Sequence, residues 1–303
     1  MVEDLCAWLR RDAVARVSYI DRAVAVEKEL NLPITCKDIE DFGELDTFPF
    51  EERVCFKQAV EALRRDNVDK LRQLLDRHGK SVWVGRGENQ ARWNLLQAVA
   101  RLVEACEDAD RQLLDHSRSL EALVDFYTSS LREVDRLQRE FEQAVGDSLG
   151  LEDDADEVIH QARLTYRKWA DQLHAIFIRH VEKSGWPMLG RLANADVFDK
   201  ILAPRLAESG RRVALFMIDA MRYELGVELA KQLNDEGQVE AQAVCAQLPT
   251  ITAVGMASLL PGAGQTLRLR RIEYKVMVEL DGQALTSVNQ SMDVLRKRYG
   301  QRF

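Results

Sequence analysis

A run of six apolar residues, 213–218, ends abruptly at Asp219 and is followed at once by a helical pattern over residues 221–233. An uninterrupted apolar run of this length is typical of a parallel strand that is covered on both faces. Parallel strands need crossover connections, which are usually helices, so the run favours an α/β architecture for this part of the chain. From residue 195 onward the predicted order is strand, helix, strand, helix, which indicates a three-layer α/β domain.

Two further strands are predicted after this run. Residues 239–245 alternate apolar and more polar side chains, as a half-buried strand does. The same alternation over residues 272–280 is followed by Asp281 and Gly282, a dipeptide that favours a tight hairpin turn. A short helix over residues 253–260 is expected to separate these two strands.

In the first two-thirds of the chain, glycine and proline are sparse and apolar residues recur at steps of three and four. This spacing places the apolar residues on one side of a helix. Helices are expected over residues 3–16, 51–64, 68–78, 88–116 and 120–145. Asp153 and Asp154 are expected to cap a further helix that ends near residues 183–187. The predicted organisation is a helical region over residues 1–194 and an α/β domain over residues 195–303.

The composition limits the possible functions. A formal net charge of -8 argues against a surface built for unspecific binding of polyanions, which needs clustered cations. The segment 268–302 is locally basic, which fits a solvated surface better than a nucleic-acid contact, although both interpretations stay open. The five cysteines form no C-x-x-C pair, and no apolar run reaches the roughly 20 residues of a membrane helix. We therefore expect a cytoplasmic protein that does not associate with membranes.

Asp219 and Thr252 are the candidate site residues. Asp219 lies where a predicted strand gives way to a helix, and open α/β sheets bind ligands at this edge. A carboxylate there can bind a divalent cation, although N-capping of the following helix is an equally good interpretation. Thr252 precedes a short helical segment, where its hydroxyl could either cap that helix or, activated by a metal ion, attack phosphorus.

Two neighbouring side chains complete the set of candidates. Thr250 competes with Thr252 for the role of nucleophile, and Thr252 is preferred because it lies closer to the start of the helix. Arg222, in the first turn after Asp219, could hold a phosphate through its guanidinium group, although an ordinary salt bridge explains it equally well.

These segments resemble a known family. The stretches VALFMIDAMRYEL and LPTITAVGMASLLPG, within residues 211–262, are similar to the PglZ domain, a branch of the alkaline-phosphatase superfamily. The resemblance implies part of a three-layer α/β alkaline-phosphatase-like domain with metal-dependent phosphatase or phosphodiesterase activity. Asp219 would be the first metal ligand and Thr252 the metal-bound nucleophile. The implied metal is zinc, with manganese as the alternative.

The resemblance also implies a biological setting. The helical region looks like the stretch that precedes this domain in PglZ proteins of BREX phage-defence systems, so a DNA methyltransferase and an ATPase are the implied partners. The superfamily completes its two-metal site with Asp and His residues downstream of the threonine, whereas all five histidines precede Asp219 here. Either the chain is a fragment of a longer protein, which we favour, or the domain has lost its second metal site. As it stands, we expect this chain to bind metal weakly and to catalyse little or nothing.

Two other functions fit the same sequence. The chain could be a non-catalytic scaffold of the defence and DNA-methylation complex, in which the long helical region binds the partners. It could also be the phosphodiesterase output domain of a signalling protein, although no receiver-type acidic cluster precedes residue 195.

Overall fold

A computed structural model describes the chain over residues 2–43, 45–65, 67–79, 81–148 and 155–300. The chain divides into two compact units. Unit 1 comprises Met1–Leu114 and Glu133–Leu173, and unit 2 comprises Asp115–Arg132 and His174–Phe303. The domain boundary that the sequence suggests between residues 194 and 195 stays a prediction. Among the described residues, no helix combines the length and the apolar character needed to cross a membrane.

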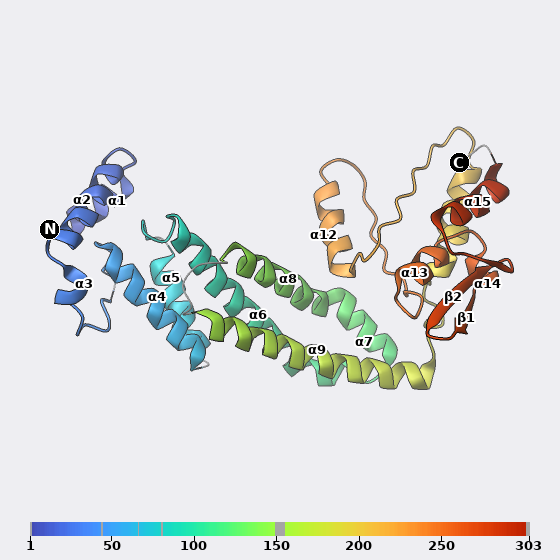
Figure 1. The fold of residues 1–303 in the computed structure, drawn as a ribbon, viewed down its shortest axis with the longest axis horizontal. Coiled ribbons are helices and arrows are strands. Elements are labelled where there is room, and N and C mark those ends of the chain that lie inside the picture. The colour runs from blue at the N-terminus through green and yellow to red at the C-terminus, as the bar shows by residue number, and fades with distance from the viewer. Residues whose placement is uncertain (1, 44, 66, 80, 149–154, 301–303) are drawn as a thin grey trace. The chain divides into compact units, whose positions relative to one another are not determined.

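The described part of unit 1 is helical (Figure 1). Its elements are α1 (Val2–Arg11), α2 (Ala15–Glu29), α3 (Leu32–Thr35), α4 (Pro49–Arg64), α5 (Val68–His78) and most of α6 (Glu88–His116), α8 (Arg132–Asp147) and α9 (Asp156–Ser184). The predicted helices over residues 68–78 and 88–116 are confirmed at both ends, because their apolar periodicity is a local property of the sequence.

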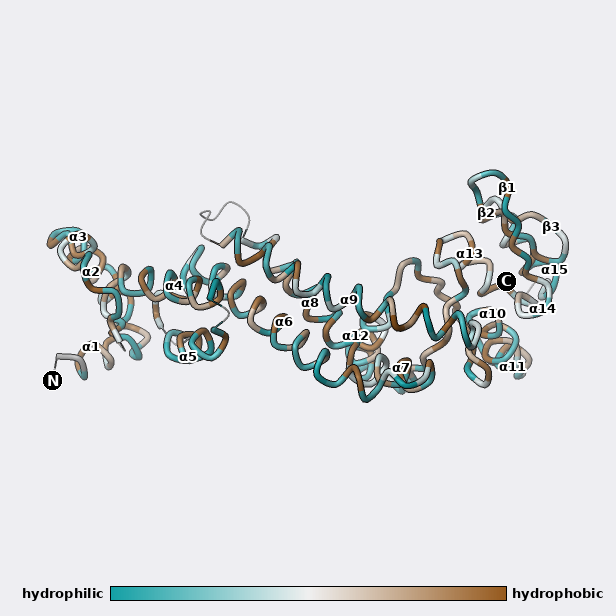
Figure 2. The backbone as a smooth tube through the Cα atoms, turned by 90° about the horizontal axis from the view of Figure 1, so that it is seen from below, coloured by the Kyte–Doolittle hydropathy of each residue, from teal (hydrophilic) through white to brown (hydrophobic). Residues whose placement is uncertain are grey.

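The long helices of unit 1 pack through one apolar side each. Figure 2 shows hydrophobic and hydrophilic stretches alternating along α6, α8 and α9, as amphipathic helices require. Phe141 of α8 and Leu102 of α6 are fully buried, and Ala162 of α9 is 1% exposed. At the rim of this core, Arg163 donates two hydrogen bonds to the carboxylate of Glu142, with donor–acceptor distances of 3.0 and 2.6 Å.

The single helix predicted over residues 3–16 is wrong, because the chain breaks it between α1 and α2. The side chain of Asp12 accepts hydrogen bonds from the backbone N–H groups of Val14 and Ala15, at 3.0 and 2.8 Å. A short acidic side chain that bonds nearby backbone in this way favours a turn over helix continuation. The predicted capping residues Asp153 and Asp154 lie outside the described residues.

Unit 2 combines short helices with a small sheet (Figure 1). Its helical elements are α7 (Leu120–Phe126), the π-helical turn η1 (Tyr127–Leu131), α10 (Asn194–Val197), the π-helical turn η3 (Phe198–Leu202), α11 (Ala203–Ala207), α12 (Tyr223–Leu233), α13 (Thr252–Ser258), α14 (Ala263–Thr266) and α15 (Val288–Tyr299), together with the end of α9. The strands β1 (Arg268–Ile272), β2 (Lys275–Leu280) and β3 (Gln283–Ala284) form an antiparallel sheet in that order.

The predicted turn at Asp281 and Gly282 is confirmed, since Leu280 pairs with Gln283 across it. The strand predicted over residues 272–280 is wrong at its start. Ile272 closes β1, and a tight turn through Glu273, which has φ of 53°, reverses the chain into β2. The alternation of apolar and polar residues continues unchanged through this turn. The pattern in the sequence therefore does not reveal that the turn is there.

The two strands predicted at residues 213–218 and 239–245 do not form among the described residues. Residues 213–218 have no regular secondary structure, with Leu215 and Met217 packed on the core while Phe216 is 83% exposed. Residues 239–245 pair only at Cys245, through one parallel bridge. A strand needs a neighbour for its backbone hydrogen bonds, and within the described part neither segment supplies one to the other. The predicted three-layer arrangement is therefore not observed there.

The core of unit 2 lies between α15, β2 and the helical stretch from α10 to α11. Its buried residues are Ala195, Phe198, Leu260, Ala263, Leu280, Val294 and Leu295. Helix α13 adds Val254 and Ala257, which pack against Val278 of β2. This core touches the segment that leads to Asp219 and also supports the helix that begins at Thr252.

Candidate functional site

Asp219 and Thr252 are in direct contact. Oγ1 of Thr252 donates a hydrogen bond to Oδ2 of Asp219 at 3.0 Å, although 33 positions separate the two residues in the chain. The other carboxylate oxygen of Asp219 accepts from the backbone N–H of Ala220 at 2.9 Å. Ala220 has φ of 53°, a left-handed conformation that costs a non-glycine residue about 1–2 kcal/mol. Strain of this kind is tolerated where the surrounding structure enforces it, often at functional sites.

Neither residue caps a helix in the way that the sequence allowed. Helix α12 begins at Tyr223 with Arg222 in the N-cap position, so Asp219 lies outside the helix. Thr252 is the first residue of α13, and Ile251 occupies the N-cap position. The N-capping interpretations are therefore not observed, and the two side chains bond to each other instead.

The separation of the two oxygens suits a shared cation. Hard divalent ions bind oxygen at about 2.1 Å, which places two adjacent ligands about 3 Å apart when they meet the ion at right angles. Both Asp219 and Thr252 are exposed, so solvent ions can reach them. No group of three or more His, Cys, Asp or Glu side chains that could hold a metal occurs among the described residues. These two residues therefore fit a divalent ion as a partial ligand set.

Three of the five histidines have other partners within the described part of the chain. The ring of His78 is buried and stacks on Trp93 at 6.2 Å, and the ring of His116 stacks on Phe126 at 4.1 Å. His180 forms a 2.8 Å hydrogen bond through Nε2 with the backbone carbonyl of Ser117. These histidines have structural partners, which explains their presence without a role in metal binding.

The other sequence candidates lie close along the chain. Arg222 is exposed and forms no ion pair with a described residue, so the salt-bridge interpretation is not observed and its guanidinium group is open to a phosphate. Thr250 is exposed and makes no side-chain hydrogen bond within the described part, in contrast with Thr252. Glu224 is only 2% exposed, although the sequence offered no reason to assign it a role. Its position in the first turn of α12, close to Asp219 in the chain, is the feature that could have drawn attention to it.

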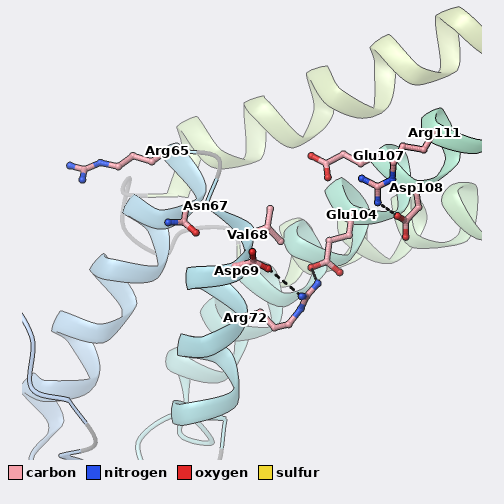
Figure 3. A pocket seen from close by; sticks show the side chains of 9 residues that line it. All are labelled: Arg65, Asn67, Val68, Asp69, Arg72, Glu104, Glu107, Asp108 and Arg111. Carbon is pink, nitrogen blue, oxygen red and sulfur yellow. Dashed lines mark hydrogen bonds and ion pairs between the residues drawn. The ribbon is translucent and has the colours of Figure 1, made fainter.

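A separate polar pocket of about 540 Å³ lies in unit 1 between α5 and α6 (Figure 3). Arginine and acidic side chains line it together. Arg72 pairs with both Asp69 and Glu104, and Arg111 pairs with Asp108. Two of its three arginines are thus paired with acidic side chains of the same lining, so the pocket offers no cluster of free charge of one sign.

Comparison with known proteins finds a family model and two relatives. Residues 197–302 match the family model of the BREX system PglZ alkaline phosphatase-like domain. By this match, the part of the chain that holds Asp219 and Thr252 is similar to an alkaline-phosphatase-like domain of the PglZ type. The match confirms the resemblance seen in the sequence.

Two curated relatives carry related names. The alkaline phosphatase-like protein PglZ of Bacillus cereus (strain H3081.97) is 26% identical over 263 residues, which cover 81% of this chain and 29% of the relative. The alkaline phosphatase-like protein BrxZ of Escherichia coli O9:H4 (strain HS) is 31% identical over 98 residues, covering 31% of this chain and 11% of the relative. The chain thus spans less than a third of the length of either relative. No solved structure matches the chain.

Proposed function

We propose that this chain is a component of a BREX-type phage-exclusion system and that its PglZ-type domain carries a metal-dependent phosphatase or phosphodiesterase site. The observation that supports the site is the 3.0 Å hydrogen bond between Thr252 and Asp219, because it joins the two oxygen-bearing residues of the two motifs. The family match and the names of the relatives support the biological setting.

Each residue of the site has a distinct task in this proposal. Asp219 offers a carboxylate to a divalent cation, with zinc as the favoured ion and manganese as the alternative. Thr252 shares that cation and presents its hydroxyl as the nucleophile, which Asp219 orients by accepting its hydrogen bond. Arg222 holds a phosphate oxygen through its guanidinium group. The bound cation supplies the positive charge that makes the hydroxyl more acidic and the phosphorus more open to attack.

We further infer that turnover by this chain alone is slow. The described residues provide two ligands for a cation, whereas a catalytic zinc site uses three protein ligands. Metal binding is consequently a sharper test of the site than hydrolysis.

Replacing Asp219 by asparagine is expected to weaken the binding of Mn²⁺ at least about tenfold, because the amide keeps the shape of the side chain and removes the charge that attracts the ion. Isothermal titration of the whole chain with Mn²⁺ and then with Zn²⁺ measures the change. Asp235→Asn is the matched control, since Asp235 is an exposed acid of the same unit and lies apart from the motif.

Two results would count against the assignment. Equal Mn²⁺ affinity of the Asp219→Asn variant and the unmodified chain would remove the metal ligand. Where hydrolysis of a phosphodiester is measurable, an activity that Thr252→Ala leaves unchanged would remove the nucleophile.

A second candidate function, a non-catalytic scaffold, is favoured by the surface of the first two helices. Leu5 and Trp8 of α1 are 56% and 58% exposed, and Val17 of α2 is 61% exposed. Large exposed apolar side chains are candidates for protein–protein contacts where they form a contiguous patch. The proposed partners are a DNA methyltransferase and an ATPase of the same defence system.

Substitution of Trp8 by serine is expected to lower the capture of a co-expressed methyltransferase or ATPase by the tagged whole chain at least about fivefold, because large aromatic residues contribute most of the energy of an interface. The amount of partner retained on the affinity resin is the measurement. Leu164→Ser, at a position of α9 that is 45% exposed, serves as the control. If the unmodified chain retains neither partner, the scaffold function loses its support.

A further inference from the structure

The antiparallel ribbon of β1 and β2 is buried on one face at the end of β2, and its opposite face is mostly exposed. Val278 and Leu280 are 1% and 0% exposed, and they pack into the core of unit 2. Because side chains alternate along a strand, Glu279 points to the opposite face. The pairing register places Arg268 directly across from Glu279, so Arg268 and Arg270 belong to the exposed face as well.

Lys275 extends this row of cations. It pairs across the ribbon with Ile272, which has the same orientation along β1 as Arg268 and Arg270. Arg270 is neutralised by Glu279 through a 3.0 Å ion pair. Neither Arg268 nor Lys275 forms an ion pair with a described residue, and Arg268 donates only to backbone carbonyls. The exposed face of the ribbon therefore carries uncompensated positive charge.

The tip of the ribbon is also unusual. Tyr274 is 96% exposed, which leaves a large aromatic ring in solvent. Arg271 is fixed beside it, because its Nε donates to the backbone carbonyl of Glu273 at 3.1 Å. Residues 268–280, which form the ribbon, hold four basic and two acidic side chains, a net charge of +2 in a chain whose total is -8. The ribbon is thus a basic surface on an acidic protein.

Nucleic acid is the partner that this surface fits best. A two-stranded antiparallel ribbon has the width that the major groove of a duplex admits, and a row of cations along it matches the spaced charges of phosphates. A surface that inserts into a lipid interface would present several large apolar side chains and few charges on one face. Here three of the six side chains on the exposed face are cationic and one is acidic.

We propose that the exposed face of the β1–β2 ribbon (Figure 1) binds the phosphate backbone of duplex nucleic acid, with Arg268 and Lys275 as the phosphate contacts and Tyr274 at the groove edge. The ribbon packs through Val278 on α13, the helix that starts with Thr252. The binding is independent of metal and of hydrolysis. Only the choice of nucleic acid over other polyanions rests on the proposed phosphodiester chemistry.

The test is a double charge reversal, Arg268→Glu with Lys275→Glu, in the whole chain. Fluorescence anisotropy of a labelled duplex oligonucleotide in low-salt buffer with EDTA measures the affinity. The variant is expected to bind the duplex at least about tenfold more weakly. Its affinity is also expected to depend less steeply on salt: the slope of log affinity against log salt concentration should fall by about one for each phosphate that the protein no longer neutralises. The presence of EDTA separates this result from the metal site, so failure here leaves the Asp219–Thr252 proposal untouched.

The matched control reverses two exposed charges on α2, Arg22→Glu with Lys28→Glu, and changes the net charge of the chain equally. Circular dichroism and thermal melting verify that both double variants fold. An equal loss of affinity in both would show a global charge effect and overturn the proposal. So would binding that is confined to the single-stranded oligonucleotide, or to vesicles containing phosphatidylserine, with no binding to the duplex.

Discussion

Truncation of Phe198 to alanine is expected to destabilise unit 2 by about 3–5 kcal/mol, the usual cost of deleting a fully buried aromatic ring. Phe198 is 0% exposed and lies in the core cluster of unit 2, with its ring centroid 5.3 Å from that of Tyr299. Leu215 and Met217 pack against the same cluster, just before Asp219. The cavity is therefore expected to loosen the segment that carries the candidate metal ligand.

Hydrogen exchange followed by mass spectrometry is the suitable measurement, because it reads each segment separately in a chain of two units. Peptides from β2 and α15 are expected to lose protection in the Phe198→Ala variant, while peptides from α6 keep theirs. Leu189→Ala is the control, since Leu189 is 98% exposed in the same unit. Unchanged protection of β2 in the Phe198→Ala variant would show that the ring does not support this core.

Substitution of Gly262 by alanine is expected to destabilise unit 2 by about 2 kcal/mol. Gly262 has φ of 78°, a conformation that costs an alanine about 1 kcal/mol or more. A Cβ atom there would meet the guanidinium group of Arg298. Arg298 would have to move and give up its 2.7 Å ion pair with Asp281, a partly exposed pair that contributes up to about 1 kcal/mol.

Gly210→Ala separates the two causes. Gly210 has φ of 76° in the same unit, but a Cβ atom there would meet nothing within 4 Å, so its variant reports the backbone cost alone. A second readout follows the ion pair directly. The hydrogen bond from Arg298 lowers the pKa of the Asp281 carboxyl group, and that pKa is expected to rise in the Gly262→Ala variant when followed by NMR titration. Equal stability of the Gly262→Ala and Gly210→Ala variants would contradict a role for Arg298.

The sequence predicts those helices whose apolar spacing depends only on residues within the helix itself. The bounds of α5 and α6 follow from apolar spacing alone, whereas the break at Asp12 depends on one side chain that competes for backbone N–H groups. The strand at residues 213–218 failed for a different reason. Apolar character predicts burial on two faces, but a strand also requires a paired neighbour, which a sequence window does not contain.

The candidate site was predicted in part. The sequence placed Asp219 and Thr252 near each other on the expectation that two neighbouring strands would end at one sheet edge. The structure has the contact at 3.0 Å without those strands. Helix α13, which begins at Thr252, packs on β2 through Val254 and Ala257, and Leu215 and Met217 pack on the core of unit 2 just before Asp219. The left-handed backbone of Ala220 was not predictable, since alanine gives no signal for positive φ. The metal and nucleophile roles of the two residues stay predictions.

The apolar segment at residues 213–218 is expected to affect how the purified chain associates in solution. Its backbone has no strand partner within the described part, and Phe216 and Ile218 are 83% and 54% exposed. Apolar backbone without a strand partner can pair with a second molecule. We therefore expect concentrated samples to self-associate, and the substitution Phe216→Lys to reduce this association by placing a charge in the apolar segment.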